Sequence, residues 1–203
     1  MCERVLNPAL TDEAQLLQRA RRADLAAFNE LVTAYESLVY NLCYRLLGQR
    51  QAAEDAAQEA FIAAWRGIAG LRGDALRPWL LRIAANACRD ELRRRSRRPS
   101  SSLDVALEEG LPEPAHPAPS PEASALQGEL RGRLEAALRT LPAEQRLALV
   151  LCDVQGLDYA EIAIVMKTSL GTVKSRIARG RGRLRQALLA ERELLPSRFR
   201  PKE

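Results

Sequence analysis

Residues 158–185 read DYAEIAIVMKTSLGTVKSRIARGRGRLR, and this stretch predicts a helix-turn-helix. Asp158 and Glu161 have the spacing of a capping box, in which each side chain bonds the backbone of the other at the start of a helix. That short helix extends to about Met166, and after a tight turn Ser169 can cap a second helix. A short helix, a turn and a basic helix form the unit with which many proteins enter the DNA major groove.

The second of these helices separates an apolar stripe from a cationic face. At about 100° per residue, Val173 and Ile177 fall on the stripe that must face a core. Lys174, Ser175 and Arg179 lie opposite or beside it and are candidates for reading base edges, because lysine and arginine donate to guanine O6 and N7. Flanking arginines are better placed for phosphates, namely Arg176, Arg181 and Arg183. The plain alternative is a solvated basic face without a partner.

A second basic helix is predicted eighty residues upstream, where residues 79–95 read WLLRIAANACRDELRRR. At spacings of four, three and four, one face carries Arg82, Asn86, Arg89 and Arg93. Asn86 can both donate to and accept from a base. Two basic helices on one chain suggest a protein that contacts DNA at two separated places.

The loop before this helix, residues 67–77, contains three glycines. An exposed loop beside a basic helix can hold unstacked bases, and the backbone of Gly70 or Gly73 can approach a base closely. Trp79 could stack on such a base, although a lone tryptophan is more often part of a core. The loop is therefore a candidate for single-strand contact.

The whole chain favours helix. It has 203 residues with 47% apolar and only 4% aromatic residues, and alanine, leucine and arginine dominate. Caps and apolar periodicity predict an all-α protein. The expected helices cover about residues 12–22, 25–47, 51–66, 78–98, 125–139, 143–152, 158–166 and 169–189. Gly180 and Gly182 interrupt the last helix, and we expect it to fray there.

Charge divides the chain into regions. The net charge is +5, but residues 99–128 hold five acids and no lysine or arginine, so the rest carries +10. Residues 99–122 contain six prolines and cannot bury enough apolar surface to fold. We predict an N-terminal helical bundle at 1–98, a flexible acidic linker at 99–124, a helix-turn-helix domain at 125–192 and a basic tail at 193–203.

The third predicted helix has an acidic face. Its start carries Glu54, Asp55, Gln58 and Glu59. The helix dipole accounts for the first two, since acids are stabilised near a helix N-terminus. It accounts less well for Gln58 and Glu59, which favours a protein-binding surface.

The sequence does not show the residue patterns that several other functions require. The four cysteines form no Cys-x-x-Cys pair, and His116 is the only histidine, so we expect no metal and no cofactor. No P-loop, catalytic triad or paired-carboxylate site is visible, and we expect no enzyme. We also expect no signal peptide and no membrane insertion, which together favour a cytoplasmic protein.

The sequence resembles the extracytoplasmic-function sigma factors of bacteria, the sigma-E-like group in particular. The resemblance covers roughly residues 24–98 and 125–190. It is carried, in order, by 55–61 (DAAQEAF), 71–74 (LRGD), 79–86 (WLLRIAAN), 141–142 (LP), 159–163 (YAEIA) and 171–176 (GTVKSR). The last motif alone also occurs in LuxR-type regulators, whereas the ordered set is specific.

The resemblance implies a division of labour between the two basic helices and the acidic one. Asp55, Gln58 and Glu59 would bind core RNA polymerase. The −10 promoter element would be opened and read by the loop and fourth helix, through Arg72, Gly73, Asp74, Trp79, Arg82, Asn86, Arg89 and Arg93. The −35 element would be read by the last helix, through Thr172, Lys174, Ser175, Arg176, Arg179 and Arg183. The family also implies an anti-sigma factor as a further partner.

Two other interpretations stay open. A stand-alone helix-turn-helix regulator would bind duplex DNA without polymerase and prefer palindromic half-sites. A sigma-like decoy would only titrate a regulatory partner and would not need its base-reading residues.

Overall fold

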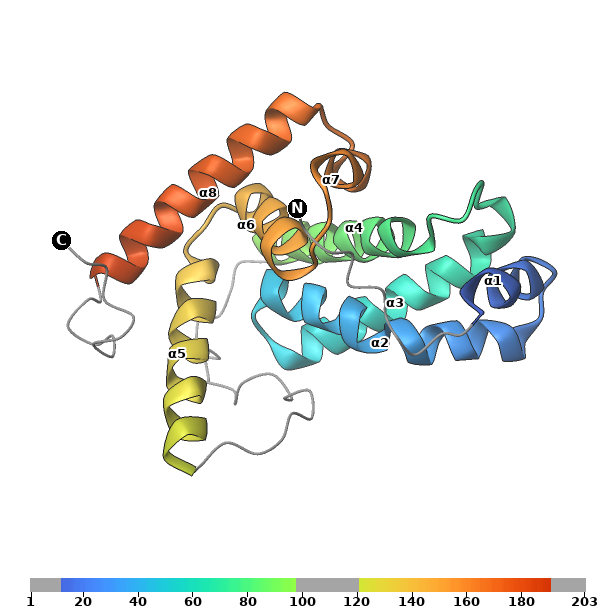
Figure 1. Cartoon of the computed structure of the whole chain (residues 1–203), viewed down its shortest axis with the longest axis horizontal. Coiled ribbons are helices and arrows are strands. Elements are labelled where there is room, and N and C mark those ends of the chain that lie inside the picture. The colour runs from blue at the N-terminus through green and yellow to red at the C-terminus, as the bar shows by residue number, and fades with distance from the viewer. Residues whose placement is uncertain (1–11, 98–120, 191–203) are drawn as a thin grey trace.

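The structure, a computed structural model, describes residues 12–97 and 121–190. For residues 121–127 it describes the backbone only. Every regular element in these ranges is helical, as the sequence predicts (Figure 1). The first group is α1 (Glu13–Arg21), α2 (Leu25–Leu47), α3 (Arg50–Gly67), a short 3-10 turn (Ile68–Gly70) and α4 (Leu76–Arg97). The second is α5 (Pro121–Arg139), α6 (Ala143–Leu149), a π-helical turn (Val150–Val154), α7 (Tyr159–Met166) and α8 (Leu170–Ala190).

The helix ends of the N-terminal region follow local capping chemistry. The side chain of Asp12 accepts from the backbone N–H of Gln15, and that of Asp24 accepts from Ala27, both at 3.1 Å. Gly48 ends α2 in the left-handed conformation, with φ +72°, which a glycine adopts without strain. Helices α2, α3 and α4 then pack against one another, and α1 lies across α2.

The predicted capping box at the start of α7 is present. The Asp158 carboxylate accepts from the Glu161 N–H at 2.8 Å, and the Glu161 carboxylate accepts from the Asp158 N–H at 2.9 Å. Ser169 Oγ accepts from the N–H of Thr172 at 3.2 Å at the start of α8. The helix-turn-helix therefore has the predicted bounds.

Two expectations about helix ends were wrong. Helix α5 begins at Pro121 rather than near residue 125, so residues 121–124 belong to a helix and not to the linker. Proline suits a first turn, where its missing N–H has no helical partner to lose. Helix α8 also runs unbroken to Ala190 instead of fraying at Gly180 and Gly182.

Gly180 has a packing role that explains its presence. It is buried against α6, and a Cβ built on it would lie 2.4 Å from Leu149 Cδ1 and 3.3 Å from the Gln145 carbonyl oxygen. Only glycine allows α6 and α8 to approach this closely without displacement. No atom lies within 4 Å of a Cβ built on Gly182.

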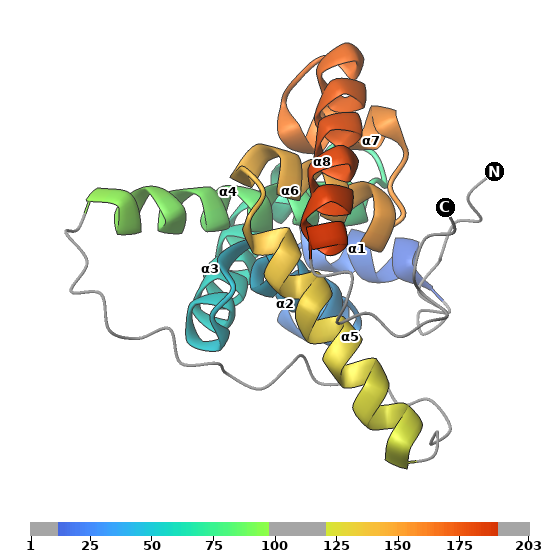
Figure 2. The same ribbon diagram turned by 90° about the vertical axis from the view of Figure 1, so that its left-hand side faces the viewer.

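The two helical regions are in contact. One apolar cluster contains buried residues of α2, α3 and α4 together with residues of α6, α7 and α8. Helix α7 packs on α4, and α6 lies over the end of α2 (Figures 1 and 2). The expected linker, apart from residues 121–124, and the basic tail lie outside the described residues.

Candidate nucleic-acid interface

Helix α8 presents a cationic surface on the side opposite its buried stripe. Val173 and Ile177 are buried, whereas Lys174, Arg179 and Arg183 are exposed. The helical-wheel prediction for these five side chains agrees with the structure. Three exposed cations on one helix give a surface that can reach bases and phosphates in a major groove.

The hydroxyl groups near the start of α8 are occupied locally. Thr172 Oγ1 lies 2.9 Å from Ser169 Oγ, and Ser175 Oγ donates to the Thr172 carbonyl at 2.9 Å. These bonds fix the first turn of the helix. A base contact by Thr172 or Ser175 has to share or replace them.

Two arginines expected at the phosphate rim are instead paired with carboxylates of this chain. Arg176 Nη1 lies 2.9 Å from Glu144 Oε2, at the start of α6. Arg181 Nε donates to Asp153 Oδ2 at 3.2 Å, in the π-helical turn. The hydrogen bond to Asp153 raises the pKa of Arg181. In this conformation each guanidinium already contacts a carboxylate, so a DNA phosphate would have to share or replace that contact.

On α4 the predicted face is only partly accessible. Arg93 is exposed and pairs with Asp90 at 3.3 Å, whereas Arg82, Asn86 and Arg89 are half-buried. Arg89 Nη1 donates to Asn86 Oδ1 at 3.3 Å, which orients the asparagine amide. The face exists as predicted, but helices of the C-terminal region cover part of it.

Trp79 has a packing role in this structure. Its ring is half-buried against the apolar cluster formed by α1, α2, the end of α3 with the 3-10 turn, and the start of α4. A Cβ built on Gly67 would lie 3.4 Å from Trp79 Cζ2. Core packing accounts for the residue without a stacked base.

The loop before α4 is exposed and held from one side. Arg72, Gly73 and Asp74 are exposed, and Gly73 has φ +73°. Arg21 of α1 donates to the Gly73 carbonyl through Nη2, and its Nη1 lies 3.7 Å from Asp74 Oδ1. Helix α1 is fixed in turn by the Tyr35 hydroxyl, which donates to the Glu13 carboxylate at 2.8 Å.

The acidic face of α3 is exposed. Asp55, Gln58 and Glu59 point away from the buried alanines Ala53, Ala56, Ala57 and Ala60. Asp55 accepts from Gln51 Nε2 at 3.1 Å, an ordinary bond between side chains one turn apart. The three residues therefore form an exposed polar surface on α3, the helix that packs against α4.

The largest difference from the sequence-based picture is that one carboxylate joins the two cationic helices. Arg89 Nε of α4 donates to Glu144 Oε1 at 2.9 Å, while Arg176 of α8 contacts the other oxygen. Burial raises the pKa of Glu144, but the hydrogen bond from Arg89 and the charges of Arg89 and Arg176 outweigh it and lower the pKa overall.

Sequence reasoning missed Arg21 and Glu144. Arg21 lies at the end of α1, where a basic residue is adequately explained by the helix dipole. Glu144 lies in the first turn of α6, where an acid is explained in the same way. Their actual partners are 52 and 55 residues distant along the chain, and no local pattern signals them.

The described residues hold no candidate metal site. They contain no group of three or more histidine, cysteine or acidic side chains placed to hold a metal. Within the same ranges, no helix combines the length and apolar character needed to cross a bilayer.

Two family models match this chain, one on each group of helices. The model of Sigma-70 region 2 matches residues 31–98, and that of Sigma-70 region 4 matches residues 131–184. The RNA polymerase sigma-H factor of Pseudomonas aeruginosa is 39% identical, over 87% of this chain and 93% of that protein. The ECF RNA polymerase sigma-E factor of Escherichia coli strain K12 is 38% identical over the same shares.

A solved structure of another sigma factor has a similar fold. The sigma factor RpoE of Bartonella quintana, in complex with the anti-sigma factor NepR, has a TM-score of 0.60 and 26% identity. The match covers 90% of this chain and all of that one. The chain belongs to the ECF group of RNA polymerase sigma factors.

Proposed function

We propose that this protein is an alternative sigma factor that binds bacterial core RNA polymerase and directs it to promoters. The observation that carries the proposal is the presence of both family regions in order, with an exposed cationic surface on α8 and a partly covered one on α4. The chain supplies recognition and strand capture, and catalysis belongs to the polymerase. It acts in the cytoplasm, where polymerase and promoter are found.

The two regions have different tasks in this proposal. Lys174, Arg179 and Arg183 of α8 read and bind the −35 element as a duplex. Asn86 and the loop before α4 read the −10 element and capture an unstacked base. Opening the duplex costs about 1.4 kcal/mol per step, and contacts to unstacked bases offset part of it.

Two protein partners complete the proposal. Asp55, Gln58 and Glu59 on the exposed face of α3 bind core polymerase. An anti-sigma factor holds the chain inactive, by analogy with the complex described for the Bartonella sigma factor. Phosphate contacts make promoter binding strongly dependent on salt.

Transcription in vitro with core polymerase and a promoter library tests the function. We expect specific initiation, reduced about five- to 150-fold by Asn86→Ala or Arg179→Ala, because each removes a base-reading group worth about 1–3 kcal/mol. Arg22→Ala, an exposed arginine at the end of α1, is the matched control and should initiate normally.

The same experiment separates the alternatives. Tight binding to palindromic duplexes without polymerase, and no initiation with it, would favour a stand-alone regulator. Polymerase binding with no initiation at any promoter would favour a decoy.

A further inference from the structure

We infer that the thiols of Cys43 and Cys88 are a site of oxidation, at which a peroxide converts them into a disulfide that joins α2 to α4. Cys43 lies near the end of α2, and Cys88 lies in the middle of α4. Both are free cysteines in the structure, and neither exposes more than 1% of its surface. Neither thiol takes part in the promoter or polymerase contacts proposed above.

The two thiols are in direct contact in the core. They belong to one apolar cluster, and the Cys88 thiol is hydrogen-bonded to the Cys43 thiol. Ala84 and Ala85 share the buried face of α4 with Cys88, and both are completely buried. Side chains this small let packed helices approach closely, which a disulfide requires because its two Cα atoms lie within about 7 Å of each other. Touching thiols on closely packed helices can form the bond with little backbone movement.

The reaction balances with hydrogen peroxide as the oxidant. The thiolate of one cysteine attacks the O–O bond and becomes a sulfenic acid, and the hydroxide that leaves takes up the thiol proton to form water. The second thiol then attacks the sulfenic sulfur, and the sulfenic oxygen leaves as a second water. Two electrons pass from the sulfur atoms to the peroxide, and the products are one disulfide and two water molecules.

Burial controls how fast this reaction runs. The hydrogen bond with Cys43 and burial raise the pKa of Cys88, so the reactive thiolate is scarce in the packed core. Oxidation therefore requires a transient local separation of α2 from α4. The same burial shields the finished disulfide from reductants. The pair is thus a site of slow and lasting modification rather than a fast sensor.

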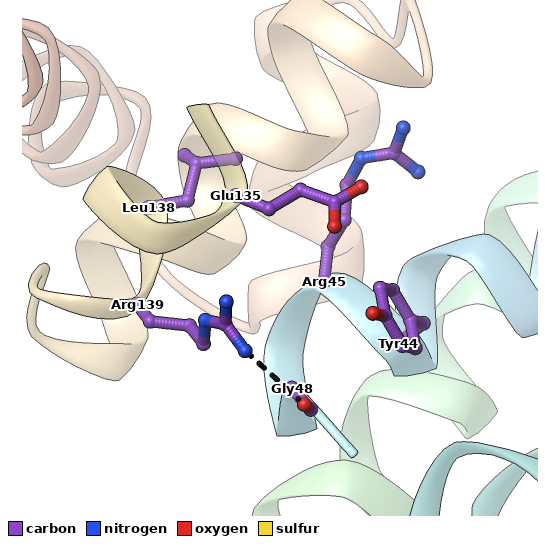
Figure 3. A pocket seen from close by; sticks show the side chains of 6 residues that line it. All are labelled: Tyr44, Arg45, Gly48, Glu135, Leu138 and Arg139. Carbon is purple, nitrogen blue, oxygen red and sulfur yellow. Dashed lines mark hydrogen bonds between the residues drawn. The ribbon is translucent and has the colours of Figure 1, made fainter. Parts of the chain in front are cut away.

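Polar contacts at the end of α2 oppose that separation. Arg146 Nη1 donates to the Leu46 carbonyl at 2.7 Å. Arg139 Nη1 donates to the Gly48 carbonyl at 3.4 Å, in the pocket drawn in Figure 3. Both acceptors lie within one and a half helical turns of Cys43 along the chain. Because cytosolic thiols are kept reduced, we expect the pair to stay a dithiol until a peroxide accumulates.

The disulfide encloses a segment that carries two of the proposed surfaces. Residues 44–87 include α3 with its acidic face, the exposed loop before α4 and the first half of α4. A bond between the two ends of a segment restricts its unfolded state and so stabilises the folded one. We therefore expect oxidation to protect the N-terminal helices against heat.

The test uses the full chain with Cys2→Ser and Cys152→Ser, which leaves only the buried pair. The reduced protein is incubated with hydrogen peroxide at neutral pH, and its remaining thiols are blocked. Mass spectrometry should find a peptide that joins Cys43 to Cys88 in protein that keeps its helices by circular dichroism. Urea below the unfolding transition should speed its formation several-fold, because transient separation limits the rate. The oxidised protein should melt roughly 5–10 °C above the reduced one, and dithiothreitol added after unfolding should cleave the joined peptide.

Cys43→Ala and Cys88→Ala in the same background are the matched controls, since each keeps one thiol and cannot form the bond within one chain. Neither control should gain melting temperature on treatment with peroxide. Peroxide that leaves both thiols of the pair intact, or carries them to sulfinic acids without a joined peptide, would overturn the inference. A joined peptide found only in protein that has lost its helices would overturn it as well.

Discussion

At the scale of single residues, Gly180 and Gly182 give a sharp comparison within one helix. We expect Gly180→Ala to lower the unfolding free energy by about 1–2 kcal/mol, because overpacking costs about 1–3 kcal/mol and the gain in helix propensity offsets at most about 1. The added Cβ would meet Leu149 and the backbone of Gln145. Thermal unfolding followed by circular dichroism should show a melting temperature lower by a few degrees.

Gly182→Ala is the matched control for this prediction. The position is exposed and a Cβ there meets no atom within 4 Å, so the substitution should stabilise α8 by up to about 1 kcal/mol. If Gly180→Ala also gained stability, the close approach of α6 to α8 would not require glycine at this position.

Arg21 gives a prediction about promoter opening. Its guanidinium bonds the Gly73 carbonyl and lies near Asp74, so Arg21→Ala should release the loop before α4. Opening of the −10 element, measured by permanganate reactivity of promoter thymines, should fall several-fold. Polymerase binding should not change, because the acidic face of α3 is untouched.

Arg22→Ala is the control for that experiment, since Arg22 is the exposed neighbour of Arg21. An equal loss in both variants would mean that general positive charge on α1, rather than the grip on the loop, supports opening. Wild-type opening in Arg21→Ala would show that the loop holds its conformation alone.

At the scale of the helices, the capping box of α7 determines where the helix-turn-helix begins. Asp158→Ala removes the bond from the Glu161 N–H to the Asp158 carboxylate, leaves the backbone N–H of residue 158 able to donate to Glu161, and should cost about 1 kcal/mol. Amide hydrogen exchange should accelerate in α7 before it does in α3. Asp158→Asn keeps a capping oxygen and should preserve most of the protection, so equal acceleration in both variants would contradict a capping role.

Most helix bounds could be predicted from the sequence because their signals are local. Asp12, Asp24, Gly48 and Asp158 act within four residues of the ends that they fix. The start of α5 could not be predicted in this way, because Pro121 and Glu122 continue the composition of the segment before them. Composition indicated a linker where the chain has already become helical.

The exposed cations of the candidate site could be predicted from the sequence, but the ion pairs of its other arginines could not. Periodicity places Lys174, Arg179 and Arg183 on the open side of α8, and the structure agrees. The same periodicity says nothing about partners distant in sequence, so the pairing of Arg89 and Arg176 through Glu144 could not be foreseen. Long-range ion pairs depend on how whole regions dock.

At the scale of the whole molecule, docking decides which surfaces are available. The sequence predicts two helical domains joined by a linker, and the described ranges contain both. What it cannot predict is that residues of α4 and α7 share one apolar cluster. Alanine-rich faces such as that of α4 are compatible with either a partner helix or solvent, and only tertiary packing selects between them.

The stability of the docked regions should depend on pH through the Glu144 carboxylate. Its folded pKa is lowered, so the unfolded chain binds its proton more readily. The stability that this carboxylate contributes is therefore present above its unfolded pKa, about 4.3, and is lost as pH falls through the lower folded value. Denaturant unfolding of the wild type and Glu144→Gln should differ at neutral pH and converge below about pH 4. A difference that stays constant across that range would mean that Glu144 stabilises the docked regions by packing rather than by charge.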